Sequence, residues 1–377
     1  MLNFNFIKSD ADLEQACTGL SMEKIIGVDL EADSMHCFKE KICLIQIAAQ
    51  DRAFLVDPFL IQNFSPFVAL LEEKNIIKVF HGADFDVRSL DRELQVEIEN
   101  LFDTEIACRF LNIRERGLAA LLQENFDVYV DKKFQKIDWA QRPLAETMIA
   151  YSIGDVAHLI ELHAILCERL EKMGRISWAQ EEFEVQARVK YESNHQLPLF
   201  KRFKGAGKMD NRSLAVLENL LQVRMDIAEK KDQPLFKNMS AQSILGLTSH
   251  RPQSIEKMID IKALSKKQAV MYGHLCQQAI SSALALAHQD LPSYPKTSMP
   301  RKDPQVMERI NRLKKMREKL SLSIGMEPGF LINNNLITAL AFTNPGTLEA
   351  LGQINEIRNW QRQVLGEEII KTLGACR

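Results

Sequence analysis

Apolar runs with the length and composition of buried strands are confined to the first hundred residues of this chain. They read IIGVDLE from Ile25, ICLIQIAA from Ile42, RAFLVD from Arg52 and IIKVFHG from Ile76. Short runs rich in Ile, Val and Leu with polar borders predict the strands of one buried sheet. Apolar residues at helical spacing dominate the sequence from about Asp84 to Met173. The front of the chain is therefore predicted to be an α/β domain with a mixed sheet.

Strand signals disappear beyond about Asp210, and the remaining sequence is helical with an internal repeat. At an offset of 93 residues the repeat aligns Arg224 with Arg317, Ile244 with Ile337, Pro252 with Pro345 and Met258 with Leu351. Because a proline is excluded from a helix interior, the matched prolines favour a repeat over a chance alignment of two Leu-rich segments. Two copies of one helical bundle are expected.

Two proline-bearing segments divide the chain. HQLPLFKRFKGAG occupies residues 195–207, and LPSYPKTSMPRKDP occupies residues 291–304. This composition is typical of linkers. We therefore expect three domains, at residues 1–195, 208–289 and 300–377.

The overall composition excludes several classes of protein. The 377 residues are 46% hydrophobic and 26% charged, which rules out a collagen-like, low-complexity or wholly disordered chain. The seven cysteines form no CxxC pair, so neither a zinc knuckle nor a disulfide framework is indicated. The N-terminal sequence lacks the layout of a signal peptide, and no apolar run reaches the roughly 18 residues of a membrane span. We expect a cytoplasmic monomer with no membrane partner.

The net charge of −2 hides a strong asymmetry between the two halves of the chain. Residues 1–200 hold 21 Lys and Arg against 34 Asp and Glu, and residues 201–377 hold 27 against 16. An acidic front and a basic rear suggest that one part holds a polyanion and presents it to a carboxylate-rich site in the other. The basic stretches at 201–208 and 309–320 fit contacts with an RNA backbone, although each also fits an ordinary solvated surface. Composition drift alone is the alternative.

Four carboxylates and one phenol stand out by position. Asp29 and Glu31 are two residues apart on a predicted strand, so both side chains leave the same face. Asp86 lies at the start of the helix that follows IIKVFHG. Asp155 lies four residues after Tyr151 on a predicted helix, so carboxylate and phenol share one helical face.

This set of oxygen ligands favours Mg²⁺ or Mn²⁺ over zinc. Clustered carboxylates repel one another, and divalent cations remove that cost. Two such ions about 3.5 to 4 Å apart stabilise the attacking and leaving oxygens of a displacement at phosphorus. The pattern therefore indicates metal-assisted phosphodiester hydrolysis, with the Tyr151 hydroxyl free to hold the attacking water in line.

The order of these residues resembles that of a known family. DLE at 29–31 with LIQIA at 44–48, HGADFD at 81–86 and YSIGD at 151–155 resemble the three motifs of the DEDDy branch of the DEDD exonucleases. The stretch from Gly117 to Leu144 is similar to the segment that joins motifs two and three in ribonuclease D. The two C-terminal repeats resemble tandem HRDC (helicase and ribonuclease D C-terminal) domains.

The resemblance spans nearly the whole chain and carries specific expectations. It implies a ribonuclease H-like DEDD exonuclease domain with a mixed sheet, followed by two all-α HRDC bundles. It implies a metal-dependent 3′–5′ exoribonuclease, a hydrolase that trims tRNA precursors with 3′ extensions and releases nucleoside 5′-monophosphates. By motif, Asp29, Glu31, Asp86 and Asp155 would be the ligands of two divalent cations, Mg²⁺ or Mn²⁺, and Tyr151 would orient the water.

Two other functions remain open on the residues alone. The chain could be a 3′–5′ exonuclease that acts on DNA, since nothing in the sequence reads the ribose 2′-hydroxyl. It could also be a non-catalytic RNA-binding protein on a decayed nuclease fold, although all five chemical positions are filled by suitable residue types.

Several further residues have both a structural and a functional interpretation. His81 is expected to be a structural histidine at a strand end, with substrate contact as the alternative. Lys132, Gln135, Trp139 and Arg142 lie in the joining segment. They could contact phosphates or stack on bases, but a packed Trp139 and a structural ion pair for Arg142 are equally expected.

Overall fold

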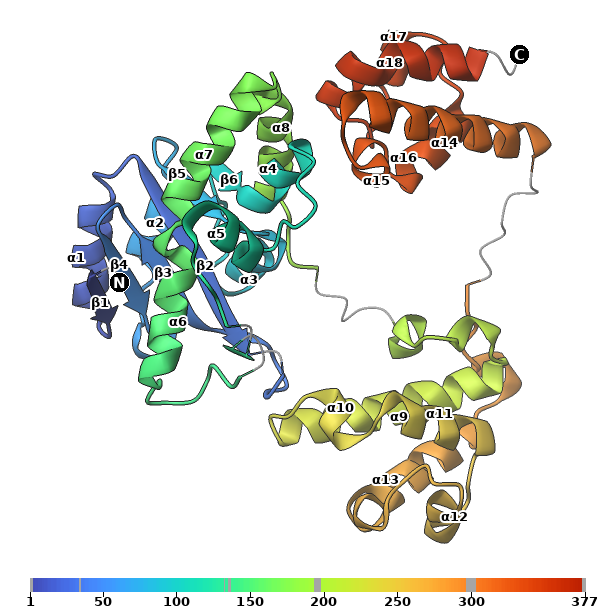
Figure 1. The fold of residues 1–377 in the computed structure, drawn as a ribbon. Helices are drawn as coiled ribbons and strands as arrows, with labels where there is room; N and C mark the ends of the chain where they lie inside the picture. Colours follow the sequence, from blue (N-terminus) through green and yellow to red (C-terminus); the bar gives the residue numbers. More distant parts are fainter. Residues whose placement is uncertain are drawn as a thin grey trace. The chain divides into compact units, whose positions relative to one another are not determined.

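The computed structural model of the chain describes residues 3–33, 35–131, 133–134, 137–192, 198–295 and 303–374. Two compact units are present (Figure 1). The first unit comprises Met1–Glu31, Ile42–Tyr191 and Met299–Arg377, and the second comprises Ala32–Lys41 and Glu192–Ser298. The units are described separately below.

The first unit begins with an α/β domain built on one six-stranded sheet. Its elements in chain order are β1 (Asn3–Ile7), α1 (Asp10–Leu20), β2 (Ile25–Asp33), β3 (Lys41–Ala48), β4 (Arg52–Val56), α2 (Ser65–Glu72), β5 (Ile77–Phe80), α3 (Asp84–Leu94), β6 (Leu101–Asp103), α4 (Thr104–Phe110), α5 (Leu118–Phe126), α6 (Glu146–Ala157), α7 (Leu159–Lys172) and α8 (Ile176–Ala187). The strand order is β1-β4-β3-β2-β5-β6. Strand β1 pairs parallel with β4, β3 antiparallel with β4, and β5 parallel with both β2 and β6. The predicted mixed sheet is confirmed.

Strands β1 and β6 were not expected from the sequence. β1 pairs only with β4 at one edge of the sheet, and three of its five residues are exposed, so it lacks a buried apolar run. β6 has only three residues, Leu101–Asp103, at the other edge. Runs this short or this exposed give little periodic signal.

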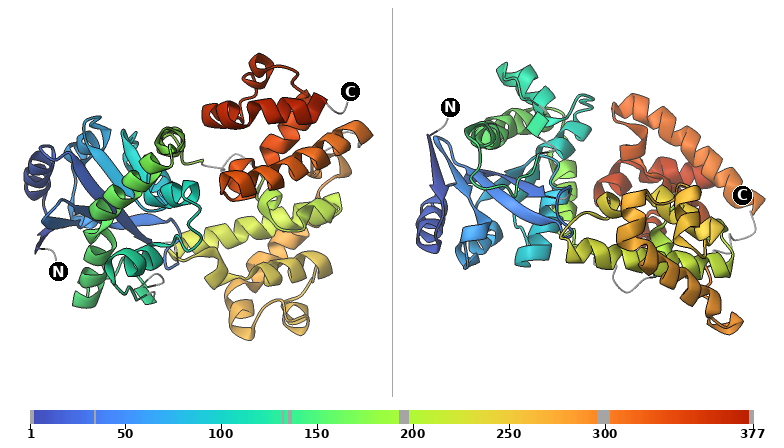
Figure 2. Two further views of the ribbon diagram at one scale, coloured as in Figure 1. Left: turned by 45° about the horizontal axis from the view of Figure 1, so that its top comes forward. Right: turned by 90° about the horizontal axis from the view of Figure 1, so that it is seen from below.

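Successive side chains of β3 point to opposite faces of the sheet. Ile45 lies opposite Val56, and both belong to the largest apolar core, which also contains residues of α1 and α2. Gln46 lies opposite Leu55, which packs in a smaller cluster with Ile153 of α6. Because paired residues share a face, Gln46 lies on the face covered by α6. Helices α6 and α7 cross this face in Figure 1, and the further views in Figure 2 agree.

Helix α7 approaches β2 closely at Gly27. A Cβ atom at this position would lie 3.1 Å from the Leu159 Cβ, closer than ordinary packing allows. The absence of a side chain at Gly27 therefore lets α7 lie directly on the strand that carries Asp29 and Glu31.

The segment Glu146–Lys172 is long and apolar enough to cross a membrane, judged by length and composition alone. It contains α6 and α7, which meet at His158. Its apolar side chains are explained by packing, since Ile153 joins the α6-side cluster and Leu159 and Leu162 join the main core. This is the character of a core helix pair.

The internal repeat predicted from the sequence is visible in the helix boundaries. The first bundle, in the second unit, contains α9 (Asn211–Lys230), α10 (Leu235–Asn238), α11 (Ala241–His250), α12 (Ile255–Asp260) and α13 (Lys266–Ala285). The second bundle, in the first unit, contains α14 (Pro304–Ile324), α15 (Pro328–Leu331), α16 (Asn334–Thr343), α17 (Leu348–Leu351) and α18 (Asn359–Gly374). Each of these five helices of the first bundle begins 93 residues before its counterpart in the second. The expected pair of all-α bundles is confirmed.

The expected linker at residues 195–207 is in part a folded segment of the first bundle. Leu199–Arg202 and Ala206–Lys208 form 3₁₀ turns, and Phe200 and Ala206 are buried in the core of this bundle. The Glu218 carboxylate accepts hydrogen bonds from the backbone N–H groups of Leu199 and Phe200, at 3.0 and 2.8 Å. The prolines and glycines that suggested a linker therefore shape an anchored turn. Residues 193–197 lie outside the described residues.

The second bundle packs on the α/β domain through aromatic rings. The Trp360 ring of α18 stacks on Trp178 of α8, with ring centroids 5.7 Å apart. Phe110 of α4 makes edge contacts with Phe330 and Trp360, at 4.9 and 5.3 Å. Side chains of both parts belong to one continuous apolar core.

Two glutamates of α8 bind the start of α18. The Glu181 carboxylate accepts hydrogen bonds from the backbone N–H groups of Asn359 and Trp360, at 2.7 and 2.9 Å. These two bonds cap the helix, because they satisfy N–H groups that a helix start leaves without intrahelical partners. The Glu182 carboxylate accepts a hydrogen bond from the Trp360 indole at 3.0 Å, which fixes that side chain.

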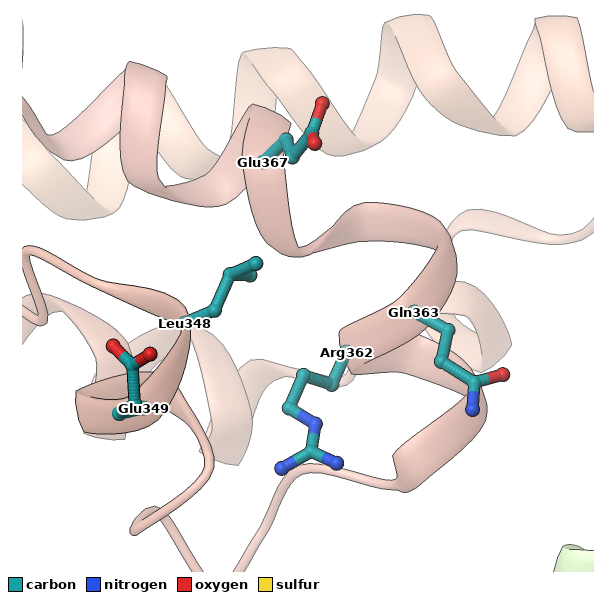
Figure 3. A pocket seen from close by; sticks show the side chains of 5 residues that line it. All are labelled: Leu348, Glu349, Arg362, Gln363 and Glu367. Atoms are coloured by element: carbon teal, nitrogen blue, oxygen red, sulfur yellow. The ribbon is translucent and has the colours of Figure 1, made fainter.

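An open pocket of about 380 Å³ lies between α17 and α18 in the second bundle (Figure 3). Its lining residues are Leu348, Glu349, Arg362, Gln363 and Glu367. Charges of both signs and a single apolar side chain line it, so it lacks the apolar walls of a typical ligand pocket.

We predict that Glu181→Ala lowers the free energy of unfolding by about 1 kcal/mol, because it removes the cap of α18. Equilibrium urea denaturation of the whole chain measures this change. The matched control is Glu184→Ala, which removes an exposed glutamate from the same helix and should change stability by less than about 0.5 kcal/mol. Equal effects of the two substitutions would contradict the capping role.

Candidate active site

Strand β2 and helix α6 bring three of the predicted carboxylates together. Asp29, Glu31 and Asp155 each place one carboxylate oxygen within 4.8 Å of the corresponding oxygens of the other two. Asp155 is buried, and Asp29 and Glu31 are partly exposed. The spacing of two residues on β2 works as expected, because both side chains leave the sheet on the face that α6 covers.

The fourth carboxylate, Asp86, comes from the first turn of α3 and is buried. Its charge helps to raise the pKa of Glu31, and the charge of Asp29 helps to raise the pKa of Asp86, so it belongs to the same cluster. Asp84, two residues earlier, pairs with Arg88 at 2.9 Å. The N-cap position of α3 is Ala83, and Asp84 is the first residue inside the helix.

Burial and mutual repulsion raise the pKa values of the clustered carboxyl groups. Burial is the largest cause in each case, and it raises the pKa of Asp29 to about 7, of Asp155 to about 8 and of Glu31 to about 10. For Glu31, the charges of Asp29, Asp155 and Asp86 add to the effect. The cluster therefore holds protons at neutral pH unless a cation replaces them. Such a donor set of hard oxygens fits divalent cations of the Mg²⁺ and Mn²⁺ type.

Tyr151 lies beside this cluster as the i, i+4 spacing predicts. Its hydroxyl donates a hydrogen bond to the Asp155 carboxylate, which lowers the pKa of Asp155 against the larger effect of burial. Burial first, and then the charges of Asp155 and Glu31, raise the pKa of the phenol. The ring packs against Phe134 and Trp139, with centroids 5.0 and 6.1 Å apart. Tyr151 is therefore a fixed, protonated hydroxyl rather than a base.

Buried polar atoms without partners gather on the same side of the sheet. Both amide atoms of Gln46 are buried with no hydrogen-bond partner among the described residues, and the same holds for the indole nitrogen of Trp139. Gln46 lies on the strand next to β2, on the face that α6 covers. Unsatisfied groups of this kind are rare in proteins. Together with the carboxylates, they fit a site that also contains ions and ordered water.

Arg142 and Trp139 of the joining segment make the packing and ion-pair contacts expected of structural residues. The Arg142 guanidinium donates to both Asp57 carboxylate oxygens, at 2.6 and 2.9 Å, and to the Cys43 carbonyl at 2.6 Å. Trp139 is buried in the α6-side cluster. Both residues therefore hold the segment against β3 and β4. The predictions for Lys132 and Gln135 fall outside the described residues.

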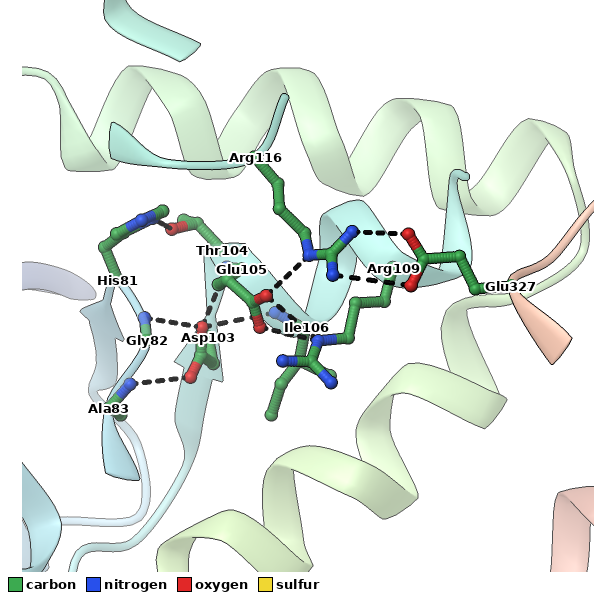
Figure 4. Close-up of polar contacts among 10 residues, drawn as sticks. All are labelled: His81, Gly82, Ala83, Asp103, Thr104, Glu105, Ile106, Arg109, Arg116 and Glu327. Carbon is green, nitrogen blue, oxygen red and sulfur yellow. Dashed lines mark hydrogen bonds and ion pairs between the residues drawn. The ribbon is translucent and has the colours of Figure 1, made fainter. Parts of the chain in front are cut away.

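His81 occupies a structural position at the end of β5. Its Nδ1 atom lies 2.8 Å from the Thr104 hydroxyl, which in turn donates to the Phe80 carbonyl at 3.1 Å (Figure 4). Burial lowers the pKa of His81 below its usual value, against the opposing charges of Asp103 and Glu105. A neutral imidazole that joins two neighbouring strands fits the structural interpretation.

Family models match both parts of the chain. A 3′–5′ exonuclease model matches residues 4–171, and an HRDC domain model matches residues 213–280 and 307–373. The exonuclease match contains Asp29, Glu31, Asp86, Tyr151 and Asp155.

Curated relatives and solved structures extend this likeness over the whole chain. The ribonuclease D of Desulfotalea psychrophila is 28% identical over 337 residues, which cover 88% of each chain. The ribonuclease D of Pseudomonas paraeruginosa is 24% identical over 98% of this chain and 97% of its own. The crystal structure of Escherichia coli RNase D has a TM-score of 0.76 at 21% identity, covers 99% of both chains, and shows the shared fold. The catalytic core of RRP6 from Trypanosoma brucei has a TM-score of 0.68 at 26% identity, over 76% of this chain and 81% of its own.

The motif order, the carboxylate cluster, the two bundles and these relatives all agree. The chain is similar to ribonuclease D over nearly its whole length, and it is a 3′–5′ exoribonuclease.

Proposed function

We propose that this exoribonuclease trims tRNA precursors with 3′ extensions and releases nucleoside 5′-monophosphates, with two divalent cations, Mg²⁺ or Mn²⁺, held by Asp29, Glu31, Asp86 and Asp155. The observation that carries the proposal is the convergence of these carboxylates from β2, α3 and α6. Four acidic groups in one partly buried cluster are costly without cations, and their raised pKa values express that cost.

The protein's own residues supply binding and orientation. Asp29 and Glu31 of β2 would hold the ions from the sheet, and Asp86 of α3 and Asp155 of α6 would hold them from the helices. When bound, the two ions would stabilise the attacking and leaving oxygens of the displacement at phosphorus. The Tyr151 hydroxyl, held by its aromatic packing and its bond to Asp155, can accept a hydrogen bond from the attacking water and fix its direction.

The choice of tRNA rests on the relatives and on charge. The E. coli relative is described as an exoribonuclease involved in structured RNA processing. In this chain, the exonuclease domain at 1–195 would cut, and the HRDC domains at 208–289 and 300–377 would bind the phosphate backbone. Phosphate contacts give affinity without sequence information, which suits substrates recognised by shape. We infer a cytoplasmic monomer.

We predict that Asp155→Asn and Asp86→Asn each reduce kcat on 3′-extended tRNA by at least about 100-fold. Each removes one charged ligand, and a bound ion contributes several kcal/mol to the transition state, with 1.4 kcal/mol for each factor of ten. The matched control is Asp84→Asn, which alters an exposed carboxylate two residues from Asp86 and should change kcat by less than threefold. Loss of activity in the control, or survival of activity in EDTA, would contradict the metal assignment.

Substrate choice is tested with the same assay. The parent protein should shorten RNA with a free 3′ end, leave RNA with a blocked 3′ end intact, and act poorly on single-stranded DNA. Equal rates on RNA and DNA would favour a DNA exonuclease, and RNA binding without hydrolysis would favour a non-catalytic protein.

We predict that Tyr151→Phe lowers kcat by about 100-fold with an unchanged KM, because only the water-orienting hydroxyl is lost.

Metal binding should stabilise the fold more at pH 8 than at pH 6. The unfolded chain releases the protons of Asp29 and Asp155 near pH 4, whereas the folded pKa values are about 7 and 8. Raising the pH between these limits therefore destabilises the metal-free protein, while ions that compete with protons bind more tightly. Thermal unfolding with Mn²⁺ or with EDTA at both pH values measures the difference. Tm shifts of equal size at the two pH values would contradict this mechanism.

Exposed lysines of α14 should contribute to RNA affinity. Lys314, Lys315 and Lys319 are exposed on this helix, whose buried stripe includes Leu313 and Met316. Changing the three lysines to Gln should weaken tRNA binding and reduce the slope of log Kd against log salt by about 1 for each lost phosphate contact. Lys371→Gln on α18, also exposed, is the matched single-charge control. An unchanged slope would show that α14 is an ordinary solvated surface.

A further inference from the structure

Asp103, the last residue of β6, is a buried carboxylate that binds two chain segments at once. One oxygen, Oδ1, accepts a hydrogen bond from the Gly82 N–H at 2.9 Å, and the other, Oδ2, accepts one from the Ala83 N–H at 2.8 Å (Figure 4). Oδ1 also accepts bonds from the N–H groups of Glu105 and Ile106, at 2.8 and 3.3 Å. Four backbone donors therefore converge on a side chain that is only 2% exposed.

The two sets of bonds have different purposes. The bonds from Glu105 and Ile106 are the ordinary N-terminal cap of α4, which begins at the next residue. The bonds from Gly82 and Ala83 are not local, because these residues join β5 to α3. Gly82 has a φ of +69°, and the capping position of α3, Ala83, offers no side-chain cap of its own. Asp103 thus fixes a turn that would otherwise lack side-chain support.

That turn leads directly to the cluster of carboxylates. Asp86 follows Ala83 by three residues, in the first turn of α3, so a shift of the turn moves its carboxylate. Asp103 also adds negative charge near the cluster, since it raises the pKa of Asp86 after burial and Asp29. Both effects, geometry and charge, favour a bound cation.

We propose that Asp103 is a positioning residue for the metal site, which it serves by holding the β5–α3 turn and thereby the Asp86 carboxylate. The proposal rests on the metal site proposed above. No sequence pattern marks Asp103, because it lies outside the exonuclease motifs and its partners at the turn, Gly82 and Ala83, are 21 and 20 residues earlier in the chain. Partners that orient metal ligands typically change metal affinity or activity by 10- to 100-fold when they are removed.

The substitution Asp103→Ser tests the two sets of hydrogen bonds separately. Serine is a good helix cap, so Asp103→Ser should keep the cap of α4. Its side chain is one bond shorter and has one oxygen, so it cannot bind Gly82 and Ala83 as the carboxylate does. Asp103→Asn provides a second variant that keeps the size but loses the charge and one acceptor.

The experiment measures Mn²⁺ binding to the full chain by titration calorimetry in the absence of RNA. We expect Asp103→Ser and Asp103→Asn to weaken Mn²⁺ binding by at least tenfold. With RNA they should lower kcat at limiting metal, leave KM for RNA unchanged, and recover part of kcat at saturating metal. A merely structural role would lower the unfolding temperature without this dependence on metal concentration.

The control lies at the outer end of the same set of contacts. Glu105 accepts a bond from Arg116 at 2.7 Å, and Arg116 donates to Glu327 of the second bundle at 2.7 Å (Figure 4). Glu327→Gln disturbs that ion pair without touching the turn, and it should leave the Mn²⁺ affinity within twofold of the parent.

The outcomes distinguish the two proposals. If the parent chain bound no Mn²⁺, the metal site itself would be wrong. If the parent bound Mn²⁺ and both Asp103 variants bound it equally well, only the positioning role would be overturned. Weakening in Glu327→Gln of the same size as in the Asp103 variants would also overturn it, because the effect would then not be specific to the turn.

Discussion

Electrostatic repulsion among four buried or partly buried carboxylates is the constraint on which this active site depends. In water such groups would separate or be solvated, but here the sheet and two helices hold them together. Burial raises the cost, since the charged form loses its hydration. The carboxyl groups therefore hold protons at neutral pH unless cations replace them, and a rigid framework must keep them together. Rigidity, more than affinity for any single group, is what the surrounding fold provides.

Different elements of the fold hold the acidic groups and Tyr151 in place. Asp29 and Glu31 are fixed by β2, a strand near the centre of the sheet, and Gly27 on that strand permits the close approach of α7. Tyr151 is restrained by aromatic contacts on one side and by Asp155 on the other. Asp86 comes from the start of a helix with no cap of its own, so its position depends on a neighbouring strand. The four acidic groups thus come from three elements, β2, α3 and α6, and no single loop carries the site.

The sequence predicted the parts of this arrangement that have local signals. Apolar runs indicated the four inner strands, and the spacing of Asp29 with Glu31 and of Tyr151 with Asp155 indicated shared faces. The three-residue strand β6 and the exposed edge strand β1, in which Asn and Phe alternate, contain no such apolar run. The segment at 199–208 was misjudged because its prolines and glycines suggest a linker, whereas Phe200 is buried in the core of the first bundle. Asp103 and Gln46 could not be assigned, because their importance depends on what the fold brings near them.

The two copies of the helical repeat differ in how the last helix of each bundle is capped. In α13 of the first bundle, Ser265 and Gln268 form a complete capping box within the helix itself. At the equivalent positions of α18, Gln361 still accepts the backbone bond from residue 358, at 3.0 Å, but Arg358 replaces the serine. Glu181 of the exonuclease domain instead accepts hydrogen bonds from the backbone N–H groups of Asn359 and Trp360. The start of α18 in the second bundle therefore depends on a contact with the catalytic domain. The start of α13 in the first bundle is capped by residues of its own helix.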